Sequence, residues 1–287
     1  MLSKIITWYR RPNKSFFADT FESLIVIIPI VFLIKTFVFG LYQVPTCSME
    51  NTMLVGERFF ADKFTPLFIA PQRGDIVSFN DPVYKYSENK IVNLYERYVS
   101  FSVVSWTKRL IGIPGDHIQG KIEDGKTVVY RNGEKLDEPY VNQYPVIELF
   151  KPHLVEVNNF GKGIVRRTVD ITKKWNDQPF YRINPIEIAR AKKYCPKNVF
   201  HPYEPLERDI FDVHLKANEY WAMGDNRQGS WDSRGWGVLD GSLIHGKIIL
   251  RLWSSDSDES WWIFDLIKHP IDFWTRVRWS RCLNIVW

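Results

Sequence analysis

The sequence has little cysteine, with three residues in a chain of 287: Cys47, Cys195 and Cys282. An odd number of this size allows at most one disulfide, for which Cys195 with Cys282 is the one pair we consider, and it excludes a fold that depends on a disulfide framework. The chain also lacks the His-x-x-x-His, Cys-x-x-Cys and Glu-x-x-His spacings of metal sites. We therefore expect no metal and no other cofactor.

A strong charge of one sign is also missing. The net charge is +5, from 38 basic and 33 acidic residues that are scattered along the chain, so nucleic acid is not expected as a partner. No internal repeat or low-complexity segment stands out. A hydrophobic content of 45% is enough for a real core in one large domain or two modest ones.

One apolar run alone is long enough to span a bilayer. Leu24 to Tyr42 is broken only by Pro29, Lys35, Thr36 and Gly40, and as a helix it would span roughly 28 Å. We predict a single transmembrane helix within residues 21–42. The flank before it carries four positive charges, which predicts that residues 1–20 are cytoplasmic and that the rest is exported: Lys4, Arg10, Arg11 and Lys14.

A cleaved secretory signal is the competing interpretation, since a basic segment before an apolar core fits it as well. The bulky run 37–42 offers no Ala-x-Ala site, and residues 44–47 match a lipoprotein box poorly, because Pro45 and Thr46 stand where small residues are needed. Both features favour an uncleaved anchor.

Beyond this segment the chain reads as mainly β. Residues 73–79 are a turn followed by a strand, and residues 127–130 are a strand that runs into an Asn-Gly turn at Asn132. We expect an antiparallel sheet or barrel-like catalytic domain in two parts, 43–123 and 213–287, with a second β-rich subdomain inserted at 124–212.

Tryptophan is abundant near the end of the chain. Of 12 tryptophans, six lie in the last 35 residues, interleaved with basic side chains: Trp253, Trp261, Trp262, Trp274, Trp279 and Trp287. Such a tail could rest in the lipid headgroup zone, or it could pack on the domain's own sheet. The sequence leaves both open.

Ser48 and Lys108 are the candidate catalytic residues. A serine and a lysine can form a nucleophile and base pair without histidine. The lysine pKa must then fall by roughly 2 to 3 units from about 10.4, which burial among apolar neighbours could provide. The rival nucleophile is Cys47, and the rival arrangement is Ser/His/Asp, although no motif places any of the six histidines.

Four ordered motifs carry a resemblance to a known family. They are residues 45–49 (Pro-Thr-Cys-Ser-Met), 73–77 (Arg-Gly-Asp-Ile-Val), 108–116 (Lys-Arg followed by Gly-x-Pro-Gly-Asp) and 224–237 (Gly-Asp-Asn-Arg and the Ser, Asp-Ser-Arg and Trp-Gly after it). Together they resemble the type I signal peptidases, membrane-anchored serine proteases that remove signal peptides from exported proteins. The resemblance covers about a fifth of the chain.

The resemblance implies a role for each matching residue. Ser48 would be the acylating nucleophile and Lys108 the general base, while the Thr46 hydroxyl would join the Ser48 N–H in an oxyanion hole. The remaining implied residues support this site: Ser230 orients the lysine, and Asp232 and Arg234 form a salt bridge.

The same resemblance implies substrate and location. The partners would be signal peptides of exported preproteins and the lipid bilayer, at a bacterial inner membrane with the catalytic domain on the extracytoplasmic face. Small residues are expected at the first and third positions before the cut. Shallow apolar pockets for them could be lined by five residues: Tyr42, Val44, Pro45, Met49 and Met53.

Several positions depart from the family pattern. Asn51 replaces a proline, Cys47 a glycine, and Trp106 and Thr107 precede the lysine, which affects the shape of the pockets. A dedicated maturation peptidase of the same chemistry and a non-catalytic, membrane-anchored peptide-binding domain stay open. A self-cleaving DNA-binding regulator does not fit, because residues 1–20 are too short for a DNA-binding segment.

Overall fold

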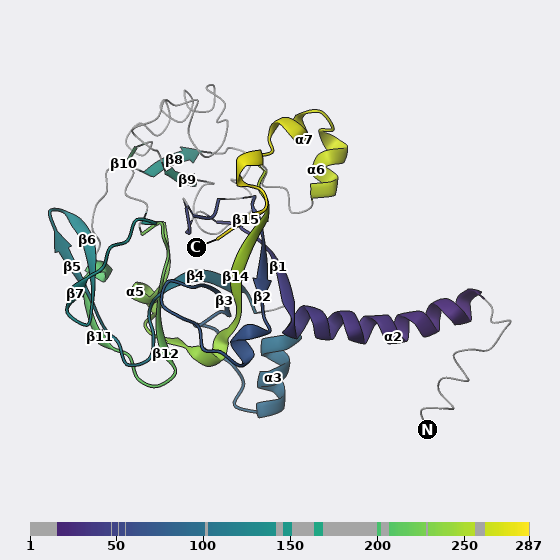
Figure 1. Cartoon of the computed structure of the whole chain (residues 1–287), viewed down its shortest axis with the longest axis horizontal. Coiled ribbons are helices and arrows are strands. Elements are labelled where there is room, and N and C mark those ends of the chain that lie inside the picture. The colour runs from purple at the N-terminus through teal and green to yellow at the C-terminus, as the bar shows by residue number, and fades with distance from the viewer. Residues whose placement is uncertain are drawn as a thin grey trace.

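Helix α2 (Phe16–Phe37) is the first described element of the computed structural model. The structure describes residues 16–46, 48–50, 52–54, 56–100, 103–141, 146–150, 164–168, 200–201, 207–227, 229–255 and 262–286. The stretch Thr20–Phe37 has a mean hydropathy of 2.0 and is only 6% buried, so it is long and apolar enough to cross a membrane. It projects away from the rest of the molecule (Figure 1).

The predicted helix boundary was wrong at its end. The helix stops at Phe37, and Phe39–Gln43 form strand β1, which pairs antiparallel with β2 (Arg58–Asp62). Hydrophobicity alone cannot separate the end of an apolar helix from a buried strand, and β1 continues the same apolar run. The chain therefore passes directly from the helix into the main sheet.

Eight antiparallel strands form the main sheet, in the order β1-β2-β14-β3-β4-β12-β13, with β15 paired to β14. This confirms the mainly β prediction, and the described strands contain no pairing that would close the sheet into a barrel between β1 and β13. The remaining strands of this sheet are β3 (Ile76–Asn80), β4 (Ser105–Gly112), β12 (Glu219–Met223), β13 (Leu239–Asp240), β14 (Ile244–Trp253) and β15 (Asn284–Ile285).

A second antiparallel sheet has the order β11-β5-β6-β7. Its strands are β5 (His117–Glu123), β6 (Lys126–Arg131), β7 (Glu134–Lys135) and β11 (Phe211–His214). The predicted Asn-Gly turn joins β6 to β7, with positive φ at Asn132 (54°) and Gly133 (85°). The boundary expected at residue 123 falls inside the β5–β6 hairpin, so the second sheet begins before the predicted insertion.

A third sheet follows with the order β10-β8-β9, from β8 (Val146–Phe150), β9 (Ile164–Thr168) and β10 (Phe200–His201). The described α-helices after α2 are short: α3 (Lys90–Tyr98), α5 (Ser233–Trp236), α6 (Trp262–Lys268) and α7 (Asp272–Thr275). Four single 3-10 turns are also described: η1 (Thr65–Leu67), η4 (Glu207–Asp209), η5 (Gly241–Leu243) and η6 (Trp279–Arg281).

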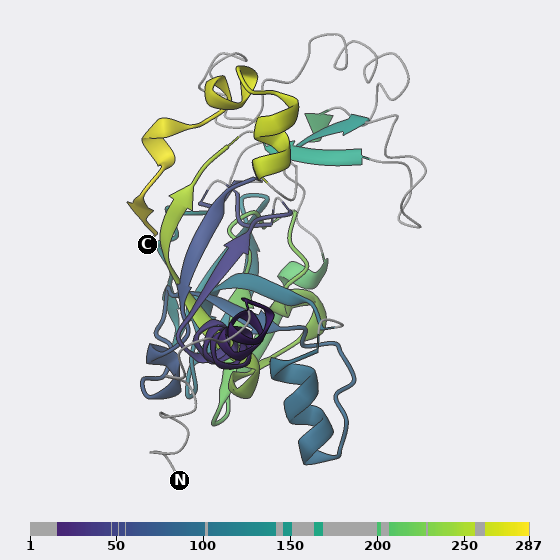
Figure 2. The same ribbon diagram turned by 90° about the vertical axis from the view of Figure 1, so that its right-hand side faces the viewer.

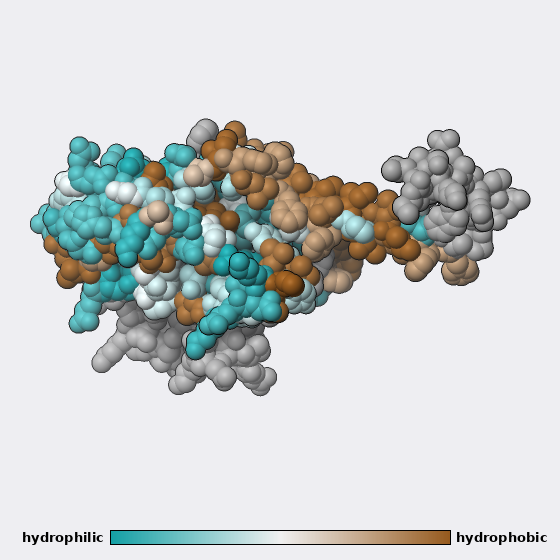
Figure 3. All heavy atoms as spheres, turned by 90° about the horizontal axis from the view of Figure 1, so that it is seen from below, coloured by the Kyte–Doolittle hydropathy of each residue, from teal (hydrophilic) through white to brown (hydrophobic). Residues whose placement is uncertain are grey.

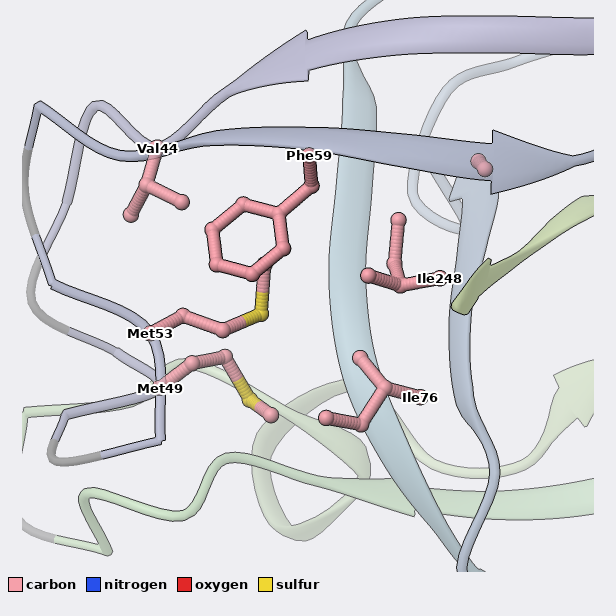
Figure 4. Packing of buried hydrophobic residues seen from close by; sticks show 7 residues of the cluster. Val44, Met49, Met53, Phe59, Ile76 and Ile248 are labelled. Carbon is pink, nitrogen blue, oxygen red and sulfur yellow. The ribbon is translucent and has the colours of Figure 1, made fainter. Parts of the chain in front are cut away.

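The loop between β1 and β2 is held down by its own apolar side chains. Met49 and Met53 from the loop point toward Phe59 of β2 and Ile76 of β3 (Figure 4), and all four are nearly fully buried. Val44, at the start of the loop, closes the same cluster. This packing anchors the loop in which Ser48 lies.

The tryptophan-rich tail packs on the sheet and also leaves rings exposed. The Trp253 ring lies 6.0 Å from Phe273 and 5.8 Å from Trp279, whereas Trp274 and Trp279 are each at least half exposed. Trp261 and Trp287 lie outside the described residues. Figure 2, which looks along α2, places α6 of this tail and α3 on the side from which α2 leaves the domain.

Candidate active site

Ser48 lies in the loop that connects β1 to β2. The Val44 N–H donates to the Glu57 carbonyl (3.0 Å) and the Gly56 N–H donates back to the Val44 carbonyl (3.1 Å), which closes the loop at its base. The carbonyl of Ser48 accepts the N–H of Asn226 at 3.1 Å, so the loop is also tied to the segment after β12. The serine is thereby fixed at the end of an edge strand.

Lys108 brings its amine to the serine from the opposite side. Its Nζ donates to Ser48 Oγ at 2.9 Å and to the Thr107 carbonyl at 3.1 Å. The residue lies in β4, paired with Val77 of β3, and its side chain is only 5% exposed. The two side chains that the sequence analysis selected, 60 positions apart, are within hydrogen-bond distance.

Thr46 lies next to the serine hydroxyl. Its Oγ1 is 3.4 Å from Ser48 Oγ, and the side chain is exposed. A hydroxyl at this place can turn toward an oxygen bound beside Ser48. The position agrees with the role that the resemblance implies.

Ser230 is buried behind the dyad. Its Oγ is covered by the surrounding protein, and the bond to Lys108 that we expected stays a prediction. Gly224 lies between Ser230 and the loop of residues 44–57 that carries Ser48, which we call the nucleophile loop. A side chain at Gly224 would collide with the Ser230 hydroxyl and the Ser48 carbonyl, so only glycine allows this close approach.

Asp232 and Arg234 form the expected ion pair. Arg234 Nη2 lies 2.7 Å from Asp232 Oδ2, and both side chains are fully buried. The same carboxylate accepts the N–H of Gly224 at 3.0 Å, while Arg234 reaches Asp209 of η4. Burial alone would raise the pKa of Asp232, but the hydrogen bond and charge of Arg234 outweigh it and hold the pKa below its ordinary value.

A second buried pair lies beside the lysine and was not predicted. Arg109, the residue after Lys108, donates through Nε and Nη2 to both oxygens of Asp225 at 2.9 and 2.8 Å. Its guanidinium lies 4.0 Å from the centre of the Tyr140 ring, and Thr52 of the nucleophile loop donates to Asp225. Arg109 and Asp225 stand in the recognised motifs, which was the signal available in the sequence.

The far end of the nucleophile loop is tied to the C-terminal tail through Glu57. This carboxylate is fully buried and accepts from Arg251 of β14 at 3.0 Å and from Arg281 of η6 at 2.6 Å. Burial would raise the pKa of Glu57, yet the hydrogen bond and charge of Arg281 and the charge of Arg251 hold it below its ordinary value. No motif pointed to this cluster.

Ser48 and Lys108 open into a cavity of about 500 Å³. All five residues predicted for the substrate pocket line it: Tyr42, Val44, Pro45, Met49 and Met53. Residues 104–108 and Trp231 also line it. Trp231 was not predicted, because an exposed aromatic in a turn-rich segment gives no specific signal.

The rival Ser/His/Asp arrangement finds no support in the described residues. His245 bonds to two residues that line this cavity, Tyr42 through Oη (3.2 Å) and Ser105 through Oγ (3.4 Å). Burial, with the nearby charge of Lys63, lowers the pKa of His245 to about 3, so its ring is neutral. The side chains of His153 and His201 lie outside the described residues.

One group of side chains in the described residues could hold a metal ion. His117, Asp212 and His214, on β5 and β11, have ligand atoms within 4.8 Å of one another. None of them lines the Ser48 cavity. Of the cysteines, Cys282 is a free thiol. Cys195, which we considered as its partner, lies outside the described residues, as does Cys47.

Comparison with known proteins agrees with this geometry. The profile of the family described as "Signal peptidase, peptidase S26" matches residues 17–253. Signal peptidase I P of Bacillus subtilis subsp. natto is 31% identical over 235 residues, 82% of this chain and 88% of that protein. Signal peptidase I of Buchnera aphidicola subsp. Schizaphis graminum is 28% identical over 87% of this chain and 79% of that protein. Signal peptidase I of Haemophilus influenzae is 26% identical over 85% of this chain and 72% of that protein. The chain therefore belongs to the signal peptidase family, peptidase S26, and is a serine peptidase.

Proposed function

We propose that this protein is a membrane-bound endopeptidase that removes N-terminal signal peptides from exported preproteins with a Ser48/Lys108 dyad. The observation that carries the proposal is the 2.9 Å contact between Lys108 Nζ and Ser48 Oγ, in a cavity beside the strand that continues from α2. The names of the relatives support the substrate class.

The acylation step follows from this contact. Lys108 Nζ takes the proton of Ser48 Oγ, and the oxygen attacks the scissile carbonyl carbon. The resulting ammonium gives its proton to the leaving amine as the C–N bond breaks, which leaves an acyl-enzyme. Lys108 then takes a proton from water, whose oxygen attacks the ester carbonyl carbon. The ammonium returns this proton to Ser48 Oγ as the ester C–O bond breaks, which releases the carboxyl product and restores Ser48.

The lysine must be neutral at the start of this sequence. Its side chain is almost completely buried, and the apolar side chains of the cavity wall exclude water around it. Removing an amine from water disfavours its charged form, which favours the base. Trp106 adds bulk on the same side, with its ring centre 5.9 Å from Nζ.

The negative oxygen of each tetrahedral intermediate needs a donor. The Thr46 hydroxyl, 3.4 Å from Ser48 Oγ, and the Ser48 N–H are the candidates. Pro45 has no N–H to offer, so a side-chain donor in this loop has a clear role.

A substrate peptide fits as an added strand. The outer edge of β1 has no partner among the described strands. The pairing of β4 with β12 begins only at Arg109, so residues 105–108 of β4 also have one edge without a described partner strand. An extended peptide between these edges could satisfy its backbone groups while small side chains enter the apolar pockets. Leucine or phenylalanine at the position before the cut should abolish cleavage.

The anchor sets the location. We propose that α2 crosses a bacterial inner membrane once, with residues 1–20 in the cytoplasm and the sheets outside. Apolar side chains cover α2 and gather where it meets the domain, while the far end of the molecule is hydrophilic (Figure 3).

The test is cleavage of a panel of preproteins by the purified protein in detergent, with the product N-termini read by mass spectrometry. Cleavage after small residues, lost in Ser48→Ala, would support the proposal. Cleavage of one preprotein alone would favour a dedicated maturation peptidase. Binding of signal peptides without any cut would favour the non-catalytic interpretation.

A further inference from the structure

A second cavity lies at the base of the anchor. It has a volume of about 310 Å³ and is enclosed by the last turns of α2, by β1 and by the C-terminal end of α3. The Phe37 ring of α2 contacts Tyr98 of α3, with ring centres 5.7 Å apart. Figures 1 and 2 show α3 beside the end of α2, where the chain would leave a bilayer. Tyr42 and Ser105 line both this cavity and the catalytic one.

Three cationic side chains line this cavity, and no aspartate or glutamate is among the described residues around it. Lys35 comes from the last turn of α2, Lys63 from the residue after β2, and Arg97 from α3. Hydroxyl groups add donors between the charges: those of Thr36, Tyr98, Ser100 and Ser105. The cavity therefore offers donors and positive charge without a carboxylate to balance them.

The charges are close enough to oppose one another. Burial lowers the pKa of Lys63, and the charge of Lys35 lowers it further. In the described part of the chain no carboxylate pairs with Lys63, whose Nζ lies 5.8 Å from the centre of the Tyr42 ring. An anion placed between the two amines would relieve this repulsion.

Arg97 also has unused donor capacity. Its Nη1 donates to the carbonyl and hydroxyl of Ser242 at 3.0 and 2.9 Å, which fixes the side chain. Its Nε is buried, and among the described residues it has no hydrogen-bond partner. A buried donor of a charged group without a partner is costly, and a ligand oxygen would satisfy it.

One side of the cavity is apolar. Phe32 of α2, Leu41 of β1 and Val99 after α3 line it, and all three are exposed at the surface that faces along the anchor. On α3 itself Ile91 and Leu94 are exposed as well. The cavity thus places cations and apolar side chains side by side at the end of α2.

We propose that this cavity binds the phosphate-bearing headgroup of an anionic phospholipid, with the phosphate between Lys35, Lys63 and Arg97 and an acyl chain along Phe32 and Leu41. From the proposed function this inference takes only the membrane anchoring of α2. A lipid bound in this cavity holds the base of the domain at the bilayer surface. The catalytic cavity lies next to it. An inorganic phosphate could use the same donors but would make no contact with the apolar side.

The test compares lipid binding to the full-length protein by native mass spectrometry, from micelles doped with phosphatidylglycerol or phosphatidylcholine. The wild type should retain phosphatidylglycerol preferentially, and Lys63→Gln should weaken that binding about ten-fold, as expected for a lost charge-assisted contact. Lys63→Arg should restore it. Lys216→Gln, at an exposed lysine after β11, is the matched control and should change nothing.

Equal retention of the two lipids, or unchanged binding in Lys63→Gln, would overturn the proposal. Displacement of phosphatidylglycerol by millimolar inorganic phosphate alone would also overturn it, because the cavity would then be a site for free phosphate and not for a lipid headgroup. Preprotein cleavage in detergent is measured on the same samples. A wild-type protein that does not cleave preproteins would count against the proposed function, and the lipid-binding measurement would still test the lipid proposal.

Discussion

Two layers of opposite character surround the candidate dyad. Next to Lys108, but outside the lining of the cavity, lies a layer of buried ion pairs that we call the polar wall, Arg109 with Asp225 and Asp232 with Arg234. In front stands an apolar wall from the loop after β1, with Met49 and Met53 packed into the core. We propose that the polar wall holds the lysine and the nucleophile loop in position, and that the apolar wall limits the access of water to the amine and receives the substrate.

The two walls should fail in different ways. Buried charges that lose a partner destabilise the whole domain, because an unpaired charge cannot be solvated there. Changes at the dyad itself should remove chemistry and leave the fold intact. The following variants are chosen to separate these outcomes.

The largest effect is expected at the dyad. Ser48→Ala and Lys108→Met should each reduce peptide cleavage to background with an unchanged unfolding midpoint, because both residues act in one proton-transfer unit. The double variant should be no worse than either single one. Cleavage assays with denaturation curves for all three proteins check this, and a double variant far below both singles would show independent action.

The polar wall is tested by Asp232→Asn, which keeps the shape and removes the charge opposite Arg234. We expect a loss of about 3 kcal/mol in the free energy of unfolding, because Arg234 keeps Asp209 but loses the carboxylate that it contacts through both Nε and Nη2. Urea denaturation measures it. Asp212→Asn, at an exposed carboxylate, is the control, and equal losses in the two variants would show that the buried pair has no special weight.

The apolar wall contributes one polar group, the Thr46 hydroxyl. Thr46→Val keeps the branched shape and should lower kcat by about 10² to 10³, or roughly 2.7 to 4 kcal/mol of transition-state stabilisation, with little change in KM. Thr46→Ser should be nearly silent. A normal kcat in Thr46→Val would leave Thr46 with a packing role only.

The smallest expected effect is on the pH dependence of stability, through the ion pairs by which Glu57 links the nucleophile loop to the C-terminal tail. Because the pKa of Glu57 in the folded protein lies below its ordinary value of about 4.3, its ion pairs stabilise the protein above that pH. This contribution is lost as the pH falls through the folded pKa. Stability measured from pH 6 to 3 should therefore fall more steeply in the wild type than in Glu57→Gln, and parallel curves would refute the role of the cluster.

The sequence predicted which candidate residues lie together better than it predicted the contacts around them. Ser48, Lys108, Thr46 and the pair Asp232–Arg234 were predictable because each lies in a short motif with a recognisable spacing. The five pocket residues were predictable because they flank Ser48 in the chain. Ser230 was placed near the dyad, yet its hydrogen bond to Lys108 stays a prediction.

The parts that could not be predicted depend on distant contacts. The Glu57–Arg281 pair joins residues 224 positions apart, and no local pattern announces it. The end of α2 was misplaced because strand β1 is as apolar as the helix that precedes it, and only its pairing with β2 decides its conformation. Likewise, the β5–β6 hairpin crosses the boundary that composition suggested.

The central claim, that the amine of Lys108 is the base for Ser48, is tested most directly by changing the basicity of that amine. In a variant without the three native cysteines, Lys108→Cys should be inactive, and alkylation with bromoethylamine would place a less basic amine at the same position. The account predicts that activity returns and that the acid limb of the pH profile of kcat/KM moves to lower pH. Restored activity with an unmoved acid limb would contradict it.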